Sequence, residues 1–232
     1  MKNHTKKLNE TLQHVQTHPA KKPLRILIAD DHAIVRKGLK QVLIDDLGPV
    51  EFGEASNGHD ALAQVQKAQW DIALLDVTMP GPSGLDVLKQ LKELQPSTRV
   101  LVLSMHPEDQ YAVRVLRAGA AGYLTKNTAS DLVAEAVKKV LAGGTYVSAA
   151  LAESLAGRLN EPPTKAPHEK LSDREFQILR LIATGKSVKE IAYDLSLSVK
   201  TVSTYRARLL QKLRLTTTAE LIRYALREGL IE

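Results

Sequence analysis

The sequence predicts two folds in succession: an α/β domain on a doubly wound, five-stranded parallel sheet, and then a small all-α domain of four helices. Short, nearly continuous apolar runs alternate with helical patterns from Leu24 to Leu141, which is typical of a parallel sheet covered by helices on both faces. From Leu171 onward only helical patterns with capping signals remain. A segment rich in glycine and proline lies between the two parts.

The first domain alternates strands and helices in a regular order. Five apolar runs are expected to form the strands: Leu24–Ala29, Val50–Ala55, Ile72–Leu75, Arg99–Leu103 and Ala121–Leu124. Five amphipathic stretches are expected to form the helices: Ala33–Asp45, Gly58–Ala68, Gly84–Leu94, Pro107–Ala118 and Thr128–Leu141. This alternation predicts consecutive β-α-β units, whose connections place helices on both faces of the sheet.

The second domain shows the start and stop signals of helices. Ser172 with Glu175, and Ser187 with Glu190, have the spacing of capping boxes, in which each side chain satisfies a free backbone N–H at the helix start. Gly185 suits the end of the first helix. Three further segments follow: Val188–Leu195, Val199–Leu213 capped by Ser198, and Thr218–Glu228. The short turn before Val199 predicts a helix-turn-helix.

Composition limits the classes of protein to which the chain can belong. Its 232 residues suffice for two hydrophobic cores. It has no cysteine, so disulfides and thiolate metal sites are excluded. No run approaches the ~18 apolar residues of a membrane span, and the lysines near the N-terminus are not followed by an apolar segment. We therefore expect a cytoplasmic protein.

Charge is distributed unevenly along the chain. Residues 1–23 carry 5 Lys/Arg and 1 acidic residue and are expected to form a mobile basic tail. Residues 171–232 carry 11 Lys/Arg against 7 acidic residues. A basic C-terminal unit favours a polyanionic partner such as DNA. The intervening 143–170 is expected to be a linker that is partly helical, because Leu151, Leu155 and Leu159 keep a helical spacing.

Polar residues stand where four of the predicted strands end. Asp30 and Asp31 follow the first strand, Asp76 the third and Ser104 the fourth, and Lys126 comes shortly after the fifth. The carboxyl ends of parallel strands lie at one edge of a sheet, where open α/β folds bind ligands. Three neighbouring carboxylates need a cation, and their oxygens suit Mg²⁺. The pattern predicts Mg²⁺-assisted phosphoryl chemistry on a carboxylate.

The motifs around these residues resemble a known family. Ala29-Asp30-Asp31-His32, the stretch 74–81 (LLDVTMPG) and the stretch 118–126 (AGAAGYLTK) are similar to the receiver domain of two-component response regulators. The stretch 198–213 (SVKTVSTYRARLLQKL) is similar to the helix-turn-helix of the NarL/LuxR (FixJ) type. The resemblance implies a receiver domain over 24–142 with strand order 2-1-3-4-5, and a DNA-binding domain over 171–232.

The resemblance also implies roles for single residues. Asp76 would accept the phosphoryl group of a kinase phosphohistidine and would help to bind Mg²⁺. Asp31 would coordinate the ion directly, Asp30 would do so through water, and the backbone carbonyl of Thr78 would complete the site. Three residues would sense the phosphoryl group: Ser104, Tyr123 and Lys126. Tyr123 would rotate inward after phosphorylation.

One position departs from the family. Many receivers have a proline after the lysine, with a cis peptide, whereas Asn127 follows Lys126 here. A cis bond before a residue other than proline is rare. The geometry of this peptide is therefore left open by the sequence.

The helix Val199–Leu213 has one apolar and one polar side at 100° per residue. Val199, Val202, Leu209, Leu210 and Leu213 are expected to face the core, and the opposite side is polar and basic. By resemblance, the residues that contact DNA bases or phosphates are Lys200, Ser203, Thr204, Ala207, Arg208 and Lys212.

Arg206 does not fit the polar side of this helix. It falls among the core positions, so a structural ion pair with Glu175 or Glu190 is one interpretation. The other is that both acids serve only as capping residues.

The resemblance implies a DNA-binding response regulator with a sensor histidine kinase and promoter DNA as partners. A homodimer is expected as the phosphorylated form, because a single small DNA-binding domain offers few contacts. The last helix is a plausible dimer surface, although its apolar residues could simply complete the core. No enzyme activity is expected beyond self-phosphorylation and self-dephosphorylation.

The alternative is a transcription regulator of the same fold that works without phosphorylation. A haloacid-dehalogenase phosphatase is disfavoured because position 78 is threonine instead of a second acid, and a pure interaction adaptor leaves the basic helix-turn-helix unexplained.

Overall fold

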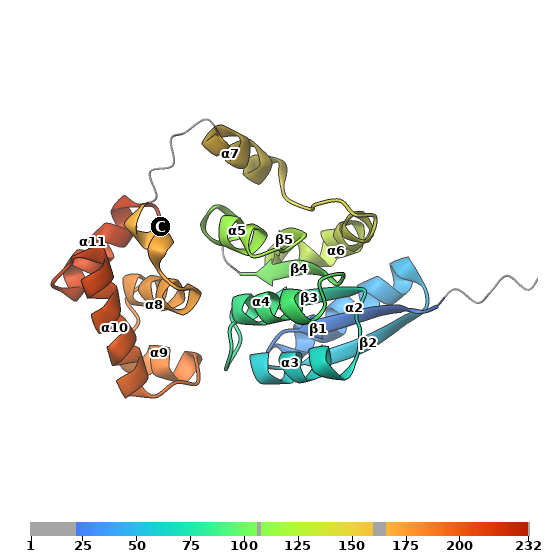
Figure 1. Ribbon diagram of the computed structural model, residues 1–232, viewed down its shortest axis with the longest axis horizontal. Helices are drawn as coiled ribbons and strands as arrows, with labels where there is room; N and C mark the ends of the chain where they lie inside the picture. The colour runs from blue at the N-terminus through green and yellow to red at the C-terminus, as the bar shows by residue number, and fades with distance from the viewer. Residues whose placement is uncertain (1–21, 106–107, 160–165, 232) are drawn as a thin grey trace, which may run out of the picture.

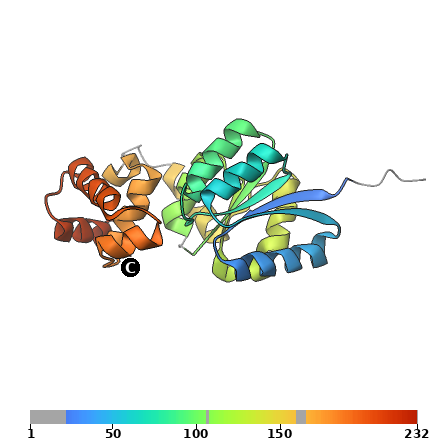
Figure 2. The ribbon, with the colours of Figure 1, turned by 90° about the horizontal axis from the view of Figure 1, so that it is seen from below.

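The computed structural model describes residues 22–105, 108–159 and 166–231. Figures 1 and 2 show two domains side by side, with the sheet in one and a cluster of helices in the other. The tail expected at residues 1–23 lies outside the described residues except for its last two positions. Within the described ranges, no helix combines the length and the apolar character that a bilayer crossing requires.

The first domain contains a five-stranded sheet whose order, β2-β1-β3-β4-β5, confirms the prediction. All neighbouring strands pair in parallel. The strands are β1 (Leu24–Ala29), β2 (Val50–Ala55), β3 (Ile72–Asp76), β4 (Arg99–Ser104) and β5 (Gly122–Thr125). The intervening helices are α2 (Ala33–Leu47), α3 (Gly58–Lys67), α4 (Gly84–Leu94), α5 (Glu108–Arg117) and α6 (Lys126–Leu141).

Two hydrophobic layers cover the faces of this sheet. Successive strand residues point to opposite faces, so in β1 Ile26 and Ile28 pack in one layer while Leu27 and Ala29 pack in the other. The first layer contains side chains of α2 and α6, and the second contains side chains of α3, α4 and α5. Strands that are buried on both sides explain the nearly continuous apolar runs in the sequence.

The buried side chain of Gln95 joins the connections at the edge of the sheet where the strands begin. Its Nε2 donates to the carbonyl oxygens of Val65 and Ala68, at 2.6 and 2.7 Å. Its Oε1 accepts from the backbone N–H of Trp70 at 3.2 Å and from the Thr98 hydroxyl at 2.9 Å. The amide therefore holds the segment after α3 against the segment after α4.

The second domain consists of helices, as the capping signals predicted. A short 3₁₀ helix, η1 (Pro167–Lys170), precedes the four helices, and sequence reasoning had included it in the linker. The helices are α8 (Asp173–Ala183), α9 (Val188–Asp194), α10 (Val199–Leu213) and α11 (Thr218–Arg227). Both expected capping boxes are present, and Ser198 accepts from the backbone N–H of Thr201 at 3.0 Å. Between the domains, α7 (Ala149–Leu159) packs against α5.

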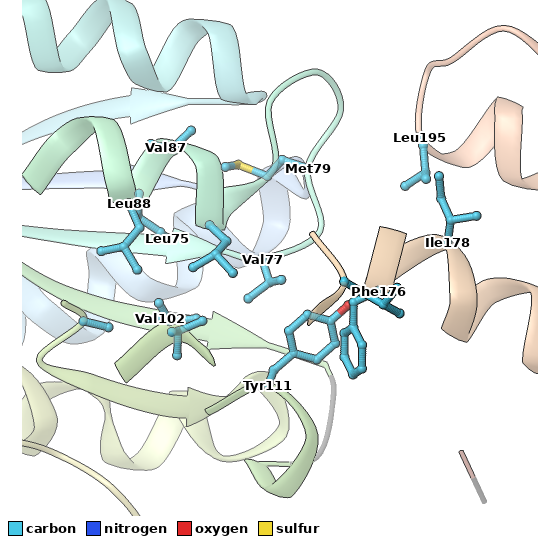
Figure 3. Packing of buried hydrophobic residues seen from close by; sticks show 14 of the residues in the cluster. Leu75, Val77, Met79, Val87, Leu88, Val102, Tyr111, Phe176, Ile178 and Leu195 are labelled. Carbon is cyan, nitrogen blue, oxygen red and sulfur yellow. The ribbon is translucent and has the colours of Figure 1, made fainter. Parts of the chain in front are cut away.

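The two hydrophobic cores meet where α5 faces α8. The rings of Tyr111 and Phe176 lie edge to face with centroids 5.3 Å apart. Figure 3 shows this pair between the receiver-side residues and the residues of the helical domain. Both side chains are buried, with exposures of 2 % and 1 %, so the contact forms part of a packed interface.

Candidate functional site

The sheet brings the five predicted polar residues to one edge. In the strand order β1-β3-β4-β5, the ends that carry Asp30, Asp76, Ser104 and Lys126 are neighbours. Asp76 closes β3 opposite Leu103, and Ser104 closes β4 opposite Thr125. The expected strand ends were one residue too short at both polar positions, because the backbone ladder continues through Asp76 and Ser104 regardless of side-chain polarity.

Lys126 holds the two buried carboxylates together. Its Nζ lies 2.7 Å from Oδ2 of Asp76 and 2.7 Å from Oδ2 of Asp30. The backbone N–H of Thr78 donates to Oδ1 of Asp76 at 3.0 Å. Burial raises the pKa of Asp76 to about 6, although Lys126 and the Thr78 N–H act in the opposite direction. Asp76 is thus mostly ionised, and therefore nucleophilic, at neutral pH.

The acidic cluster has the donor set of a divalent cation site. Asp30, Asp31, His32 and Asp76 carry ligand atoms that all lie within 4.8 Å of one another. Three carboxylates against one ammonium leave two negative charges, which a divalent cation would balance. The Asp31 side chain is 31 % exposed, so an ion bound there could keep water ligands, as Mg²⁺ requires. His32 Nδ1 lies 2.7 Å from Asp31 Oδ1.

Arg36 supports this cluster, and the sequence analysis did not identify it. Its Nη1 donates to the carbonyl oxygen of Asp30 at 2.7 Å, and its Nε bonds Oε2 of Glu54 at 3.1 Å. Arg36 thus fastens the end of β1 to β2. The sequence offered only a weak signal for this role, namely an arginine in the first turn of the helix that follows the acid pair. Its contact with Glu54 is visible only in the structure.

Both residues expected to sense the phosphoryl group beside Lys126 are buried. Ser104 and Tyr123 have no exposed side-chain surface. The ring of Tyr123 packs in the core of this structure, and its rotation after phosphorylation stays a prediction. Tyr123 points inward because β5 lies at the sheet edge beneath α5, which covers that face.

The peptide that the sequence left open is trans. The described residues contain no cis peptide bond, and Lys126–Asn127 lies among them. Thr125 is the N-cap residue of α6, which begins at Lys126, two residues earlier than expected. Lys126 therefore reaches the carboxylates from the first turn of a helix.

The polar side of α10 is open to solvent. Val202, Leu209 and Leu213 are buried, as expected, whereas Val199 is 47 % exposed because it lies in the first turn, beyond the core. The residues on the opposite side are all exposed: Lys200, Ser203, Thr204, Ala207, Arg208 and Gln211. Lys212 has a different environment, because its Nζ lies 2.7 Å from Oε2 of Glu175.

The ion pair suggested for Arg206 is not formed. Arg206 is exposed, and no ion pair of its side chain is found in the described part of the chain. Glu175 instead binds Lys212 and caps α8 through Ser172, and Glu190 caps α9 through Ser187. The long stem of an arginine lets its charge reach solvent even from the edge of a core face, which helical phase alone does not reveal.

The last helix contributes partly to the core. Leu221 and Ala225 are fully buried, so they complete the packing of the domain. Leu226 is 51 % exposed. Only the outer side of α11 is therefore available for a further contact.

Comparison with known proteins agrees with this geometry. Residues 26–138 match the response regulator receiver domain family, and residues 169–225 match the luxR family of bacterial regulatory proteins. The response regulator GacA of Pseudomonas aeruginosa is 38 % identical over 210 residues, which cover 90 % of this chain and 98 % of the relative. The response regulator UvrY of Escherichia coli is 37 % identical over 208 residues, which cover 89 % and 95 %.

Solved structures show the same order of domains. The RcsB response regulator of Salmonella typhimurium aligns with a TM-score of 0.64 and 26 % identity, over 88 % of this chain and 97 % of the other. RcsB from Salmonella enterica serovar Typhimurium bound to promoter rprA with the phosphomimetic BeF3- aligns with a TM-score of 0.59 and 28 % identity, over 87 % and 98 %. The chain therefore belongs to the DNA-binding response regulators of two-component systems, in which a receiver domain precedes a luxR-family helix-turn-helix domain.

Proposed function

We propose that Asp76 is the phosphoacceptor and that its phosphorylation controls transcription through α10. The observation that carries this proposal is the arrangement of Asp76 between Lys126 and the Thr78 N–H. Lys126 contacts Oδ2 of Asp76 and the Thr78 N–H contacts Oδ1, and Asp76 also lines a cavity at this edge of the sheet. A phosphoryl donor entering that cavity would meet a carboxylate oxygen.

The proposed transfer moves one phosphoryl group between two protein side chains. An oxygen of Asp76 attacks the phosphorus of a phosphohistidine on a sensor kinase. The P–N bond breaks, a P–O bond forms, and the imidazole leaves as the neutral ring after taking up a proton. Lys126 keeps the carboxylate ionised before the reaction and contacts the transferred group after it. Ser104, at the neighbouring strand end, is placed to bind a phosphoryl oxygen.

Mg²⁺ would be held by Asp31, by Asp30 through water, by Asp76 and by the carbonyl of Thr78. When bound, the ion neutralises charge on the transferring phosphoryl group. The negative charge that remains after Lys126 is paired supports a divalent cation at this place.

We further propose that α10 enters the major groove of promoter DNA. Ser203, Thr204 and Ala207 are short and exposed and would face the bases, while Lys200 and Arg208 would contact phosphates. Lys212 would serve phosphates only by giving up or sharing its bond to Glu175. Two copies on paired half-sites would supply the contact area that one small domain lacks. The protein would act in the cytoplasm, where that DNA lies.

Radiolabel transfer from an autophosphorylated sensor kinase tests the phosphoacceptor. Asp76→Asn should abolish labelling, because an amide cannot act as the nucleophile. Asp45→Asn is the matched control, since Asp45 is an exposed receiver carboxylate that bonds only Gln41 among the described residues. Labelling that persists in Asp76→Asn would favour the alternative regulator that works without phosphorylation at this residue.

Salt-dependent DNA binding tests α10. Arg208→Ala should weaken binding and reduce the slope of log affinity against log salt by about 1, as expected for one lost phosphate contact. Arg223→Ala, an exposed arginine on α11, is the control. An unchanged slope for Arg208→Ala would remove this residue from the DNA contact.

A further inference from the structure

The phosphoacceptor lies in a cavity that both domains enclose. The cavity has a volume of about 870 Å³. Its receiver wall includes Asp31, Asp76 and Lys126, and the opposite wall belongs to α8, α9 and the turn that follows them. Residues of the helical domain on that wall include Arg180, Lys186 and Tyr193. The docked helical domain therefore stands in front of the receiver surface through which a phosphoryl donor must arrive.

Charged contacts hold the helical domain in this position. Asp173, the first residue of α8, accepts from Lys89 Nζ at 2.6 Å and from Arg114 Nη1 at 3.4 Å. Arg114 also donates to the carbonyl oxygens of Leu171, at 3.0 Å, and His168, at 2.5 Å. The Asp173 side chain is only 13 % exposed and that of Arg114 16 %. Partly buried bonds of this kind contribute more than pairs on an open surface.

A second charged contact reaches the active-site loop itself. Arg174 donates to the carbonyl oxygen of Gly81, which lies five residues after Asp76 in the connection between β3 and α4. The apolar centre of the interface is the Tyr111–Phe176 pair (Figure 3). The Arg114 guanidinium lies 4.1 Å from the centre of the Phe176 ring. The helical domain is therefore fastened to the loop that follows Asp76 and to helices α4 and α5.

The docked arrangement covers the input site and leaves the output face open. Asp76 is 2 % exposed. The DNA-facing residues proposed for α10, such as Ser203 and Arg208, are exposed in the same structure. Docking thus obstructs the approach of a protein donor to Asp76 more directly than it covers the recognition helix.

We propose that the sensor kinase and the chain's own helical domain compete for one surface of the receiver, the surface around Asp76. This proposal rests on the proposed role of Asp76. A kinase carries its phosphohistidine on a folded protein, and even a single helix with its side chains is about 10 Å wide. Such a body cannot enter the cavity while α8 and α9 form its far wall. A small phosphodonor such as acetyl phosphate can enter.

Competition has a thermodynamic consequence. Because two partners exclude each other, docking lowers the affinity of the receiver for the kinase by the same factor by which kinase binding lowers docking. Loosening the interface should therefore accelerate phosphotransfer from the kinase. It should leave phosphorylation by a small donor nearly unchanged.

The absence of cysteine from the chain permits a site-specific lock. Lys89→Cys combined with Asp173→Cys, joined by a short bismaleimide, would tether α4 to α8 in the docked position. In the cross-linked full-length protein, transfer of label from the autophosphorylated kinase should fall by about tenfold or more, within the usual range of coupling between sites. Phosphorylation by acetyl phosphate, followed by intact mass spectrometry, should stay within about twofold of the uncross-linked protein.

The opposite perturbation uses two arginines of the same helix. Arg114→Ala should increase the rate of kinase transfer about fivefold. Arg117→Ala is the control, because its bond to Glu169 is 3.4 Å long and its side chain is 68 % exposed. Circular dichroism melting confirms that each variant is folded.

Four other results would contradict the proposal or the role of Asp76 on which it rests. Equal kinase transfer with and without the cross-link would overturn the competition, as would failure of the two cysteines to cross-link in solution. If the cross-link slows phosphorylation by the kinase and by acetyl phosphate equally, docking blocks all access to Asp76, and competition with the kinase is not the explanation. If the unmodified protein accepts a phosphoryl group from neither donor, the proposed role of Asp76 itself is wrong.

Discussion

The side-chain nitrogen of Lys126 and an oxygen of Asp76 lie 2.7 Å apart, in a site where burial and, to a smaller extent, the charge of Asp30 work against the ionised carboxylate. Lys126→Met should therefore raise the pKa of Asp76 above its value of about 6. Phosphorylation at pH 7 should then fall with the ionised fraction of Asp76, which drops by about tenfold for each further unit once the pKa lies well above 7. Part of the loss should be recovered at higher pH, as the carboxyl group ionises.

A pH–rate profile of phosphorylation measures this effect. Lys138→Met is the matched control, because Lys138 pairs with Asp46 on the exposed side of the receiver. An unshifted profile in Lys126→Met, with only a uniform drop in rate, would show that the lysine acts after ionisation and not before it.

Gly84 is required by the close approach of the backbone at Asp76. A Cβ at this position would lie 1.9 Å from the carbonyl oxygen of Asp76. Gly84→Ala should reduce the free energy of unfolding by about 2 kcal/mol, a typical cost of overpacking, and should also slow phosphorylation by displacing Asp76. Denaturant unfolding and label transfer provide the two measurements.

Gly38→Ala supplies the contrast for this substitution. Gly38 lies within α2, is exposed, and has no atom within 4 Å of a built Cβ. Alanine there should increase the free energy of unfolding by about 0.5–1 kcal/mol through the helix propensity that glycine lacks. If both substitutions change the free energy of unfolding in the same way, the backbone near Gly84 can move away from the new Cβ without a loss of stability.

Glu175 should make the stability of the protein depend on pH. Burial would raise its pKa, but bonds from Lys212 and Ser172 outweigh burial, so the pKa lies below the usual 4.5. A lowered folded-state pKa means that the ionised group stabilises the fold above about 4.5 and loses this contribution as the pH falls through the folded value. Glu175→Gln should cost about 1–2 kcal/mol at pH 7 and progressively less in acid.

Urea unfolding at a series of pH values checks this dependence. Glu190→Gln is the control, because Glu190 has the same place in the capping box of α9 but is exposed. The role of the charge would be contradicted if the free energies of unfolding of Glu175→Gln and the wild type differ by the same amount from neutral to acidic pH.

Arg206 should contribute little to stability. It is exposed, and the acid suggested as its partner is bound by Lys212. Arg206→Ala should leave the melting temperature within about 1 °C of wild type, in line with other exposed substitutions. Lys212→Met should lower it, because Glu175 would lose its counter-charge. If calorimetry shows a lower melting temperature for Arg206→Ala than for Lys212→Met, the ion pair between Arg206 and an acidic residue is supported after all.

The sequence predicted the sheet and the site well for a shared reason. Strands buried on both faces must be apolar throughout, so β1 and β3 are recognisable without any tertiary information. The polar residue after each such run is then placed by topology alone. Asp30 and Asp76 thus came together as expected, and Lys126 joined them.

What the sequence did not predict depends on contacts between distant segments. Arg114, Asp173 and Arg174 looked like ordinary surface charges, and their partners lie 54 to 93 residues away along the chain. The burial of Tyr123 was not predicted, because a buried and an exposed aromatic have the same local pattern at the edge of a sheet. Arg206 was misjudged because periodicity gives the direction of Cβ and not the place of a long side chain's end.

The amide of Gln95 gives the receiver one rigid end. All four of its contacts lie among the connections at the end of the sheet opposite Asp76, and its Nε2 and Oε1 are each bonded twice. Rearranging that end would break several buried hydrogen bonds at once, which is costly. The opposite end has polar groups that can exchange partners with a phosphoryl group, an ion or water. A rearrangement caused by phosphorylation of Asp76 would therefore be confined to the carboxyl ends of the strands, the edge on which the helical domain is docked.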